Sequence, residues 1–163
     1  MLKSTTTAPL TPIPPSVEDL ISQAAASPRK VFLMALELRL SLGMPPPNDD
    51  SAIMRFLKSL DRKLGRRLYL DPQHAWRRVR NGTRPMYHYV LLLNGDSLGS
   101  VYGARVIVQE AWNLALGLPR EPNYGLVGHG RLGDDGCVML WRDAPFLEDT
   151  LKDCRAWASL VSC

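Results

Sequence analysis

One histidine lies in the middle of a strongly apolar segment, residues 84–94 (RPMYHYVLLLN). Side chains of a strand alternate between its two faces, so His88 shares its face with Met86 and Val90. A metal site on a strand ordinarily takes ligands at i and i+2, and the thioether of Met86 is a poor ligand for the hard cations that act on phosphates. His88 is therefore a candidate metal ligand, and the alternative is a structural histidine that hydrogen-bonds to a neighbouring carbonyl.

Positive charge is concentrated around this segment. Residues 51–90 contain ten lysines and arginines against two aspartates, whereas the net charge of the whole chain is only +4. Lysine and arginine neutralise phosphates, and tryptophan stacks on unpaired bases at ~1–3 kcal/mol per base. The pattern predicts a nucleic-acid-binding surface, and the alternative is an ordinary solvated helix face. The predicted contact residues are Arg55, Lys58, Arg62, Lys63, Arg66, Arg67, Trp76, Arg77, Arg78 and Arg80.

Other kinds of site lack the residues that they need. The glycines of residues 95–103 and 128–136 have neither the spacing nor the lysine of a phosphate-binding loop. The three cysteines include no C-x-x-C pair, which indicates free thiols in a reducing compartment. His74 follows a polar turn and His129 lies between two glycines, so both are expected to be exposed.

The composition, 45% hydrophobic and 22% charged, is that of an ordinary soluble globular protein. The most apolar run, residues 31–40, is short and contains Glu37 and Arg39, so it does not predict a membrane span. The Thr- and Pro-rich N-terminus lacks the apolar core of a secretory signal. We therefore expect a cytoplasmic protein with no membrane partner.

The N-terminal third predicts a leader followed by helices. Residues 1–15 are expected to be flexible, and Ser16 with Asp19 marks a helix start. Residues 28–42 fit a second helix, because their apolar side chains recur at helical spacing. The proline-rich segment 44–50 is the best candidate for a boundary. It would separate a flexible leader and helical N-terminal segment, residues 1–50, from a domain at residues 51–163.

The remaining chain predicts an α+β fold, an antiparallel sheet with packed helices. A helix starts at Ser51 with a periodic apolar face, and the turn Asn81-Gly82 joins an antiparallel hairpin over residues 75–93. Further predicted elements are a helix at 102–116, short strands at 124–127 and 136–141, and a helix at 146–163.

The order of these segments resembles the inovirus-type replication protein family, also described as the YagK/YfjJ C-terminal domain. The matching pieces are residues 54–64 (MRFLKSLDRKL), 76–77 (WR), 87–95 (YHYVLLLNG), 111–119 (AWNLALGLP) and 125–127 (GLV). Members occur in filamentous phages and prophage remnants. They are similar to HUH rolling-circle replication initiators, whose fold is an antiparallel sheet with packed helices.

The resemblance implies a strand histidine pair that holds a divalent metal, Mg or Mn, and a helix tyrosine that attacks a DNA phosphate. His88 matches the second histidine of that pair, and Met86 stands at the position of the first. The nearest match to the family's Ser-Tyr-x-x-Lys pattern is residues 159–163 (SLVSC), with Leu160 in place of the tyrosine and Cys163 in place of the lysine. We therefore expect a C-terminally truncated or degenerate member that binds single-stranded or hairpin DNA without nicking it.

Two alternatives to this reading are open. The protein could be an active metal-dependent DNA nickase that uses His88 together with an acidic residue of a neighbouring strand. It could instead be a small protein-interaction or regulatory domain, in which the basic face meets an acidic protein. Tyr87 and Tyr89 flank His88 but are expected to point away from it, because neighbours on a strand alternate.

Overall fold

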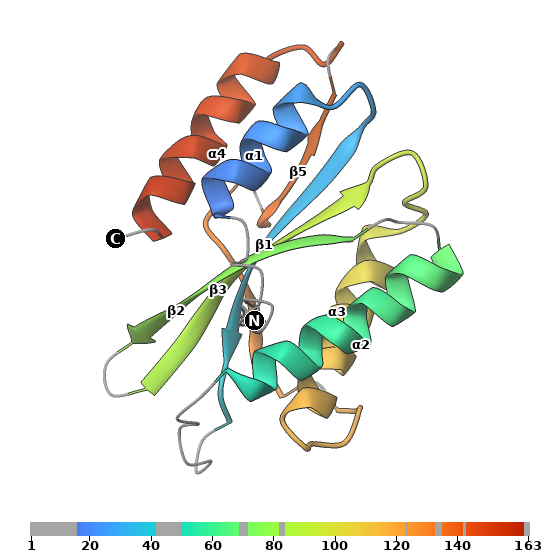
Figure 1. Ribbon diagram of the computed structural model, residues 1–163, viewed down its shortest axis with the longest axis vertical. Helices are drawn as coiled ribbons and strands as arrows, with labels where there is room; N and C mark the ends of the chain where they lie inside the picture. Colours follow the sequence, from blue (N-terminus) through green and yellow to red (C-terminus); the bar gives the residue numbers. More distant parts are fainter. Residues whose placement is uncertain are drawn as a thin grey trace, which may run out of the picture.

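The structure is a computed structural model that describes residues 16–41, 50–68, 72–81, 84–122, 124–132, 135–141 and 143–161. Within these residues, a five-stranded antiparallel sheet lies between two pairs of helices (Figure 1). The strand order is β2 (Gln73–Asn81), β3 (Arg84–Asn94), β1 (Val31–Arg39) and β4 (Val127–His129). Strand β5 (Cys137–Leu140) also pairs with β1. The predicted α+β class is confirmed.

Strand β1 is the central strand, so the helix predicted over residues 28–42 is wrong. Residues 32–36 are all buried, and β1 pairs with β3 along one edge and with β4 and β5 along the other. A continuous apolar run is typical of a strand that is covered on both faces, and here it also fits helical spacing. Strand β1 precedes the boundary expected at residue 50 and its partner β3 follows it. The two strands belong to one sheet, so the sheet spans that boundary.

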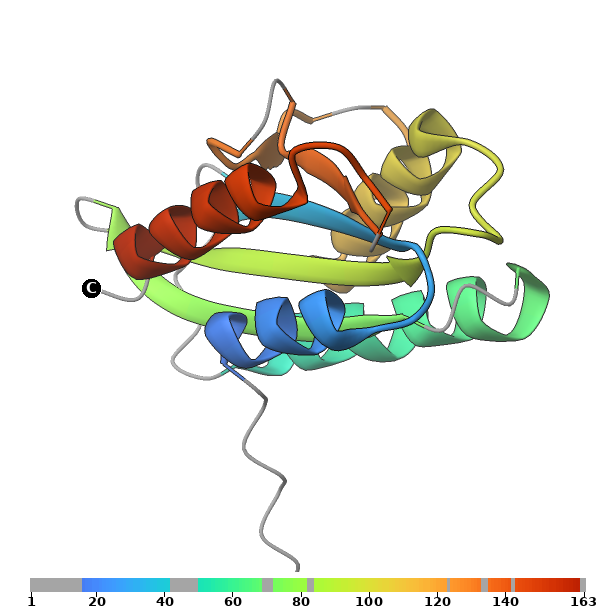
Figure 2. The same cartoon turned by 90° about the horizontal axis from the view of Figure 1, so that it is seen from above.

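Two helices cover each face of the sheet. The order β1, α2 (Ser51–Leu68), β2, β3, α3 (Val101–Ala115), β4 is the split βαβ arrangement of ferredoxin-like folds. Helices α2 and α3 pack on one face, and α1 (Val17–Ala26) and α4 (Leu147–Val161) on the other. Figure 2 shows α1 and α4 in front of the sheet and α2 and α3 behind it. None of the described helices is long and apolar enough to cross a bilayer.

The core on the α2–α3 face is built around aromatic rings. Trp112 of α3 is fully buried and meets the rings of Phe56 and Tyr87 edge-on, with centroids 5.6 and 6.0 Å away. Its Nε1–H donates to the backbone oxygen of Arg39, at 2.8 Å. The tryptophan therefore ties α3 to the end of β1.

The opposite face is closed by α1 and α4. The start of α1 is confirmed, because Ser16 and Asp19 form a capping box. Trp157 of α4 lies against Gly130, where a Cβ atom would be 3.3 Å from the indole ring and 3.2 Å from the Cβ of Ala35. A glycine at position 130 therefore allows α4 to pack closely on the sheet.

The other predicted elements are confirmed with small shifts of their ends. The hairpin predicted at 75–93 is β2 and β3, and the helices predicted at 102–116 and 146–163 are α3 and α4. The strand predicted at 124–127 begins three residues later, as β4. The described cysteines, Cys137 and Cys154, are free thiols. The expected leader, residues 1–15, and Cys163 lie outside the described residues.

Candidate functional site

Three polar side chains form a row across the sheet on the face that α1 and α4 cover. Glu37 of β1 is directly opposite His88 of β3, and His88 is directly opposite Arg77 of β2. Directly opposed residues of antiparallel strands point to the same face. The next row along the strands is buried beneath the helices and consists of Ala35, Val90 and Ala75. We call Glu37, His88 and Arg77 the polar row.

The polar row is partly open to solvent. Glu37 and His88 are partly buried, and Arg77 is exposed. The β2–β3 hairpin extends past the ends of α1 and α4 in Figure 1. No described helix covers the tip of this hairpin. The ring of His88 is only partly buried, so a polar molecule can contact it.

The carboxylate of Glu37 already has a partner. Arg39 Nη2 lies 2.7 Å from Glu37 Oε2. Gly128 of β4 is directly opposite Glu37, and a Cβ atom on this glycine would lie 3.0 Å from Arg39 Nη2. The missing side chain at Gly128 thus leaves room for the guanidinium to fold back over the sheet and bind Glu37.

The pKa of His88 is lowered from its usual value of 6.5. Burial is the largest cause, because it disfavours the charged imidazolium. The nearby charge of Glu37 raises the pKa in part, and the charge of Arg77 lowers it. His88 is therefore mainly neutral at pH 7, with its ring able to donate one hydrogen bond and accept another.

This assignment predicts how His88 titrates in an NMR experiment. The wild-type ring should titrate below 6.5. Glu37→Gln should lower the pKa further, because it removes the favourable carboxylate, and Arg77→Ala should raise it, because it removes a repulsive charge. Equal His88 titration in all three proteins would contradict the polar row.

The polar row does not fit the divalent metal that the family resemblance implies. His88 and Glu37 are two donors of suitable type, but the position two residues before His88 holds the thioether of Met86. No group of three His, Cys, Asp or Glu side chains in the described residues could hold a metal ion. Arg39 and Arg77 also place two positive charges beside the two donors. A dication would be repelled by both.

The two tyrosines beside His88 lie on the other face of the sheet, as expected. Tyr87 and Tyr89 are fully buried in the α2–α3 core, where the Tyr87 hydroxyl donates to Asp50 Oδ1 at 3.1 Å. Neither hydroxyl can therefore reach a group bound at His88. Leu160, at the family's tyrosine position, belongs to α4, which covers the same face as His88, but its side chain lies outside the described residues.

The prediction that His74 is exposed is wrong. Its side chain is only 13% exposed, with Nδ1 2.5 Å from the Tyr89 hydroxyl and Nε2 2.5 Å from Asp61 Oδ1. A carboxylate only accepts hydrogen bonds, so Nε2 carries the proton toward Asp61, and Nδ1 accepts from Tyr89 when the ring is neutral. Strand alternation could have placed His74 on the same face as Trp76. Nothing in the sequence pattern identifies Asp61 as its partner.

The predicted nucleic-acid contacts do not form one surface. Arg55 donates from Nε and Nη2 to the backbone oxygen of Ala115, at 3.2 and 2.8 Å, and so caps the end of α3. Trp76 is partly buried and packs edge-on against Tyr87, so it is not the open stacking platform that was expected. Arg78 Nη1 lies 3.5 Å from Asp50 Oδ1 on the same face.

The remaining predicted contacts lie on two faces. Lys58 and Arg62 are exposed on α2, and Lys63 is partly exposed. None of these three forms an ion pair with any residue that the structure describes. Arg77 lies on the opposite face, in the polar row. The side chains of Arg66, Arg67 and Arg80 are outside the described residues.

The side chains of the polar row are suited to binding anionic groups. Arg77 offers a guanidinium at an exposed position, and the neutral ring of His88 offers one hydrogen-bond donor. No known family, curated protein or solved structure matches the chain.

Proposed function

We propose that this protein is a phage- or prophage-derived, replication-associated protein that binds single-stranded or hairpin DNA without nicking it. The observation that supports this proposal is the positive charge on the outer side of α2. Lys58 and Arg62 are one helical turn apart and exposed, and no described acidic residue pairs with either side chain. Lysines and arginines that have no acidic partner within the protein are free to bind DNA phosphates. Their binding is favourable because it releases the counterions condensed on the DNA.

The chemistry beside His88 supports the proposed absence of nicking. A covalent nick needs a nucleophile within reach of the phosphate. The tyrosines next to His88 in the chain are buried on the other face, and the described donors do not fit a divalent cation. Arg77 can bind a phosphate as a guanidinium without any of that machinery. The polar row thus supports phosphate contact and gives no support to cleavage.

The proposal places the protein in the cytoplasm. Cys137 and Cys154 are free thiols, which suits a reducing compartment. The resemblance to replication proteins of filamentous phages agrees with this, because such proteins act on DNA inside the bacterial cell.

DNA binding is tested by fluorescence anisotropy with a labelled single strand and a labelled hairpin over about 50 to 200 mM salt. Wild type should bind, with an affinity that falls steeply as salt rises. Lys58→Ala/Arg62→Ala should weaken binding and reduce the salt slope by about 1–2, since each phosphate contact contributes about 0.7 on a single strand. Lys152→Ala/Arg155→Ala removes the same charge from exposed positions on α4 and is the matched control.

The outcomes separate the proposal from its alternatives. No binding to either DNA at low salt would overturn it. Equal weakening by the control variant would mean that net charge, and not the α2 surface, drives binding. A nicking assay with Mn²⁺ is expected to show no cleavage. Cleavage that disappears in His88→Ala would favour the metal-dependent nickase, and cleavage that persists equally in His88→Ala would exclude His88 as its metal ligand.

A further inference from the structure

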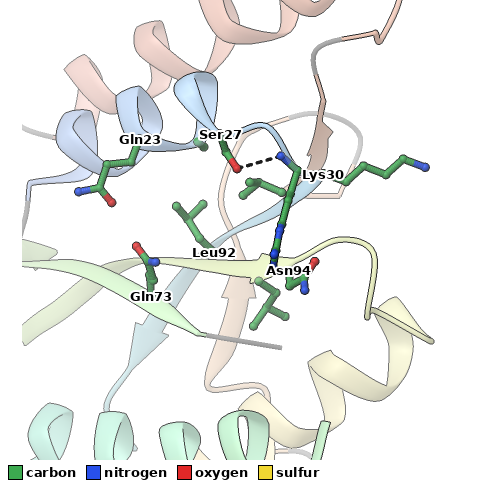
Figure 3. Close-up of a pocket in the computed structure, with 10 residues that line it drawn as sticks. Gln23, Ser27, Lys30, Gln73, Leu92 and Asn94 are labelled. Atoms are coloured by element: carbon green, nitrogen blue, oxygen red, sulfur yellow. Dashed lines mark hydrogen bonds between the residues drawn. The ribbon is translucent and has the colours of Figure 1, made fainter. Parts of the chain in front are cut away.

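A cavity of about 260 Å³ opens at the other end of the sheet from the polar row. It lies where α1 ends, β2 begins and β3 ends (Figure 3). Among the described residues, its lining contains three primary amides, two cations and no carboxylate. The residues that line it are Gln23, Ala24, Ser27, Arg29, Lys30, Val31, Gln73, Leu92, Leu93 and Asn94.

Two of the amides are available to a ligand. Figure 3 shows the side chains of Gln23 and Gln73 on the same side of the cavity, one from α1 and one from β2, with Leu92 beside them. Both glutamines are exposed, and neither amide hydrogen-bonds to a described residue. The third amide is held in place, since Asn94 Nδ2 donates to Ser97 Oγ at 3.2 Å and Oδ1 accepts from the Asp96 backbone at 3.0 Å.

An amide offers an acceptor oxygen beside a donor NH₂ group. A ligand that satisfies two such amides needs donors and acceptors side by side along one edge. Nucleobases have such edges, and glutamine or asparagine binds adenine through a pair of hydrogen bonds. The apolar side chains of Leu92 and Val31 suit the flat face of a base, which hydrogen-bonds only at its edge.

The charge at the cavity comes from Arg29. Its side chain is exposed and forms no ion pair with any described residue. Lys30 points away from the cavity in Figure 3, and its ammonium group lies 5.4 Å from the ring centroid of Trp141. One guanidinium without a carboxylate partner is suited to a single phosphate group.

We propose that this cavity binds one nucleotide, with its base against Leu92 between the amides of Gln23 and Gln73 and its phosphate on Arg29. The volume is just below the usual range for ligand pockets, about 300–1,000 Å³, which limits the ligand to one such unit. The nucleotide is either a free monophosphate or an unpaired residue of a DNA strand. The second source rests on the proposed function.

Calorimetric titration of the full chain with the four deoxynucleoside 5′-monophosphates tests the cavity. At least one should bind with a Kd of about 1 mM or tighter. Gln23→Ala/Gln73→Ala should weaken that binding about 10-fold or more, because it removes both amide contacts. Arg29→Ala should weaken the monophosphate but leave binding of the matching nucleoside unchanged. Gln109→Ala is the matched control, because that amide lines a different cavity beside α3 and β4.

Circular dichroism verifies that each variant is folded. If no monophosphate binds to the folded wild type, or if the double glutamine variant binds like Gln109→Ala, the cavity proposal is wrong. Inorganic phosphate that binds as tightly as the monophosphates would overturn base recognition.

A short single strand tested on the same variants identifies the source of the nucleotide. Monophosphate binding without strand binding supports the cavity and overturns the proposed function. The glutamine variants could also weaken binding of the monophosphate and leave binding of the DNA strand unchanged. That result would assign the cavity to free nucleotides, and the proposed function would still hold.

Discussion

Trp112→Ala is expected to lower the free energy of unfolding by about 3–5 kcal/mol, the usual cost of deleting a buried aromatic side chain. The ring of Trp112 is fully buried and packs edge-on against Phe56 and Tyr87, so its removal leaves a cavity among aromatic side chains. The substitution also removes the donor to the backbone oxygen of Arg39. Chemical denaturation followed by circular dichroism measures the loss.

Trp112→Phe separates the two contributions. Phenylalanine keeps much of the ring but cannot donate to Arg39, so its cost should be clearly smaller than that of alanine. Trp141→Ala is the control, because Trp141 is only partly buried and its ring centroid lies 5.4 Å from the Lys30 ammonium group. We expect it to cost about 1 kcal/mol or less. A loss below about 1 kcal/mol for Trp112→Ala would contradict the aromatic core.

Above pH 10 the protein is expected to lose up to about 1.4 kcal/mol of stability per pH unit through Tyr89 alone. Burial, and secondarily the charge of Asp61, raises the pKa of Tyr89 well above its usual value of 10.0. The unfolded chain therefore releases this proton near pH 10, while the folded chain keeps it. The unfolded state then binds fewer protons, so stability falls as the pH rises toward the folded pKa. Below pH 10 the contribution is fully present.

Tyr89→Phe tests this assignment. It should remove the Tyr89 contribution to the fall in the free energy of unfolding above pH 10. At neutral pH it should lower that free energy by about 1–3 kcal/mol, because His74 Nδ1 loses its hydrogen-bond donor. Tyr102→Phe changes a side chain that is 77% exposed and should keep wild-type stability at neutral pH. Stability is read from urea denaturation at several pH values between about 8 and 11. The same alkaline slope in Tyr89→Phe and wild type would show that another group is responsible.

The sequence predicts much of the fold because most elements have a single clear period. The apolar face of α2 and the alternation in β3 each match only one kind of element. Strand β1 was mispredicted because Phe32, Leu36 and Leu40 also recur at helical spacing. What decides in favour of a strand is backbone pairing with β3, β4 and β5, all of them distant in the chain.

The candidate site is only partly predictable for the same reason. Alternation along β3 predicts that the side chain of His88 lies on the opposite face of the sheet from Tyr87 and Tyr89, and the structure confirms it. In the sequence, Glu37 only interrupts an apolar run, because its position beside His88 depends on the register of two strands whose paired residues, Glu37 and His88, are 51 positions apart in the chain. The docking of α2 on the sheet likewise determines that Asp61 meets His74 and that Trp76 is partly buried.

The central position of β1 has a consequence for synthesis of the protein on the ribosome. Val31 pairs with Asn94, so β1 leaves the ribosome well before its partner β3 exists. At about 5–20 residues per second, this apolar strand remains unpaired for several seconds, the condition under which strands aggregate. Arg29 and Lys30 precede the strand and Arg39 ends it. Charges that flank an apolar strand hinder its association with other nascent chains, so we expect these residues to limit aggregation before the protein has folded.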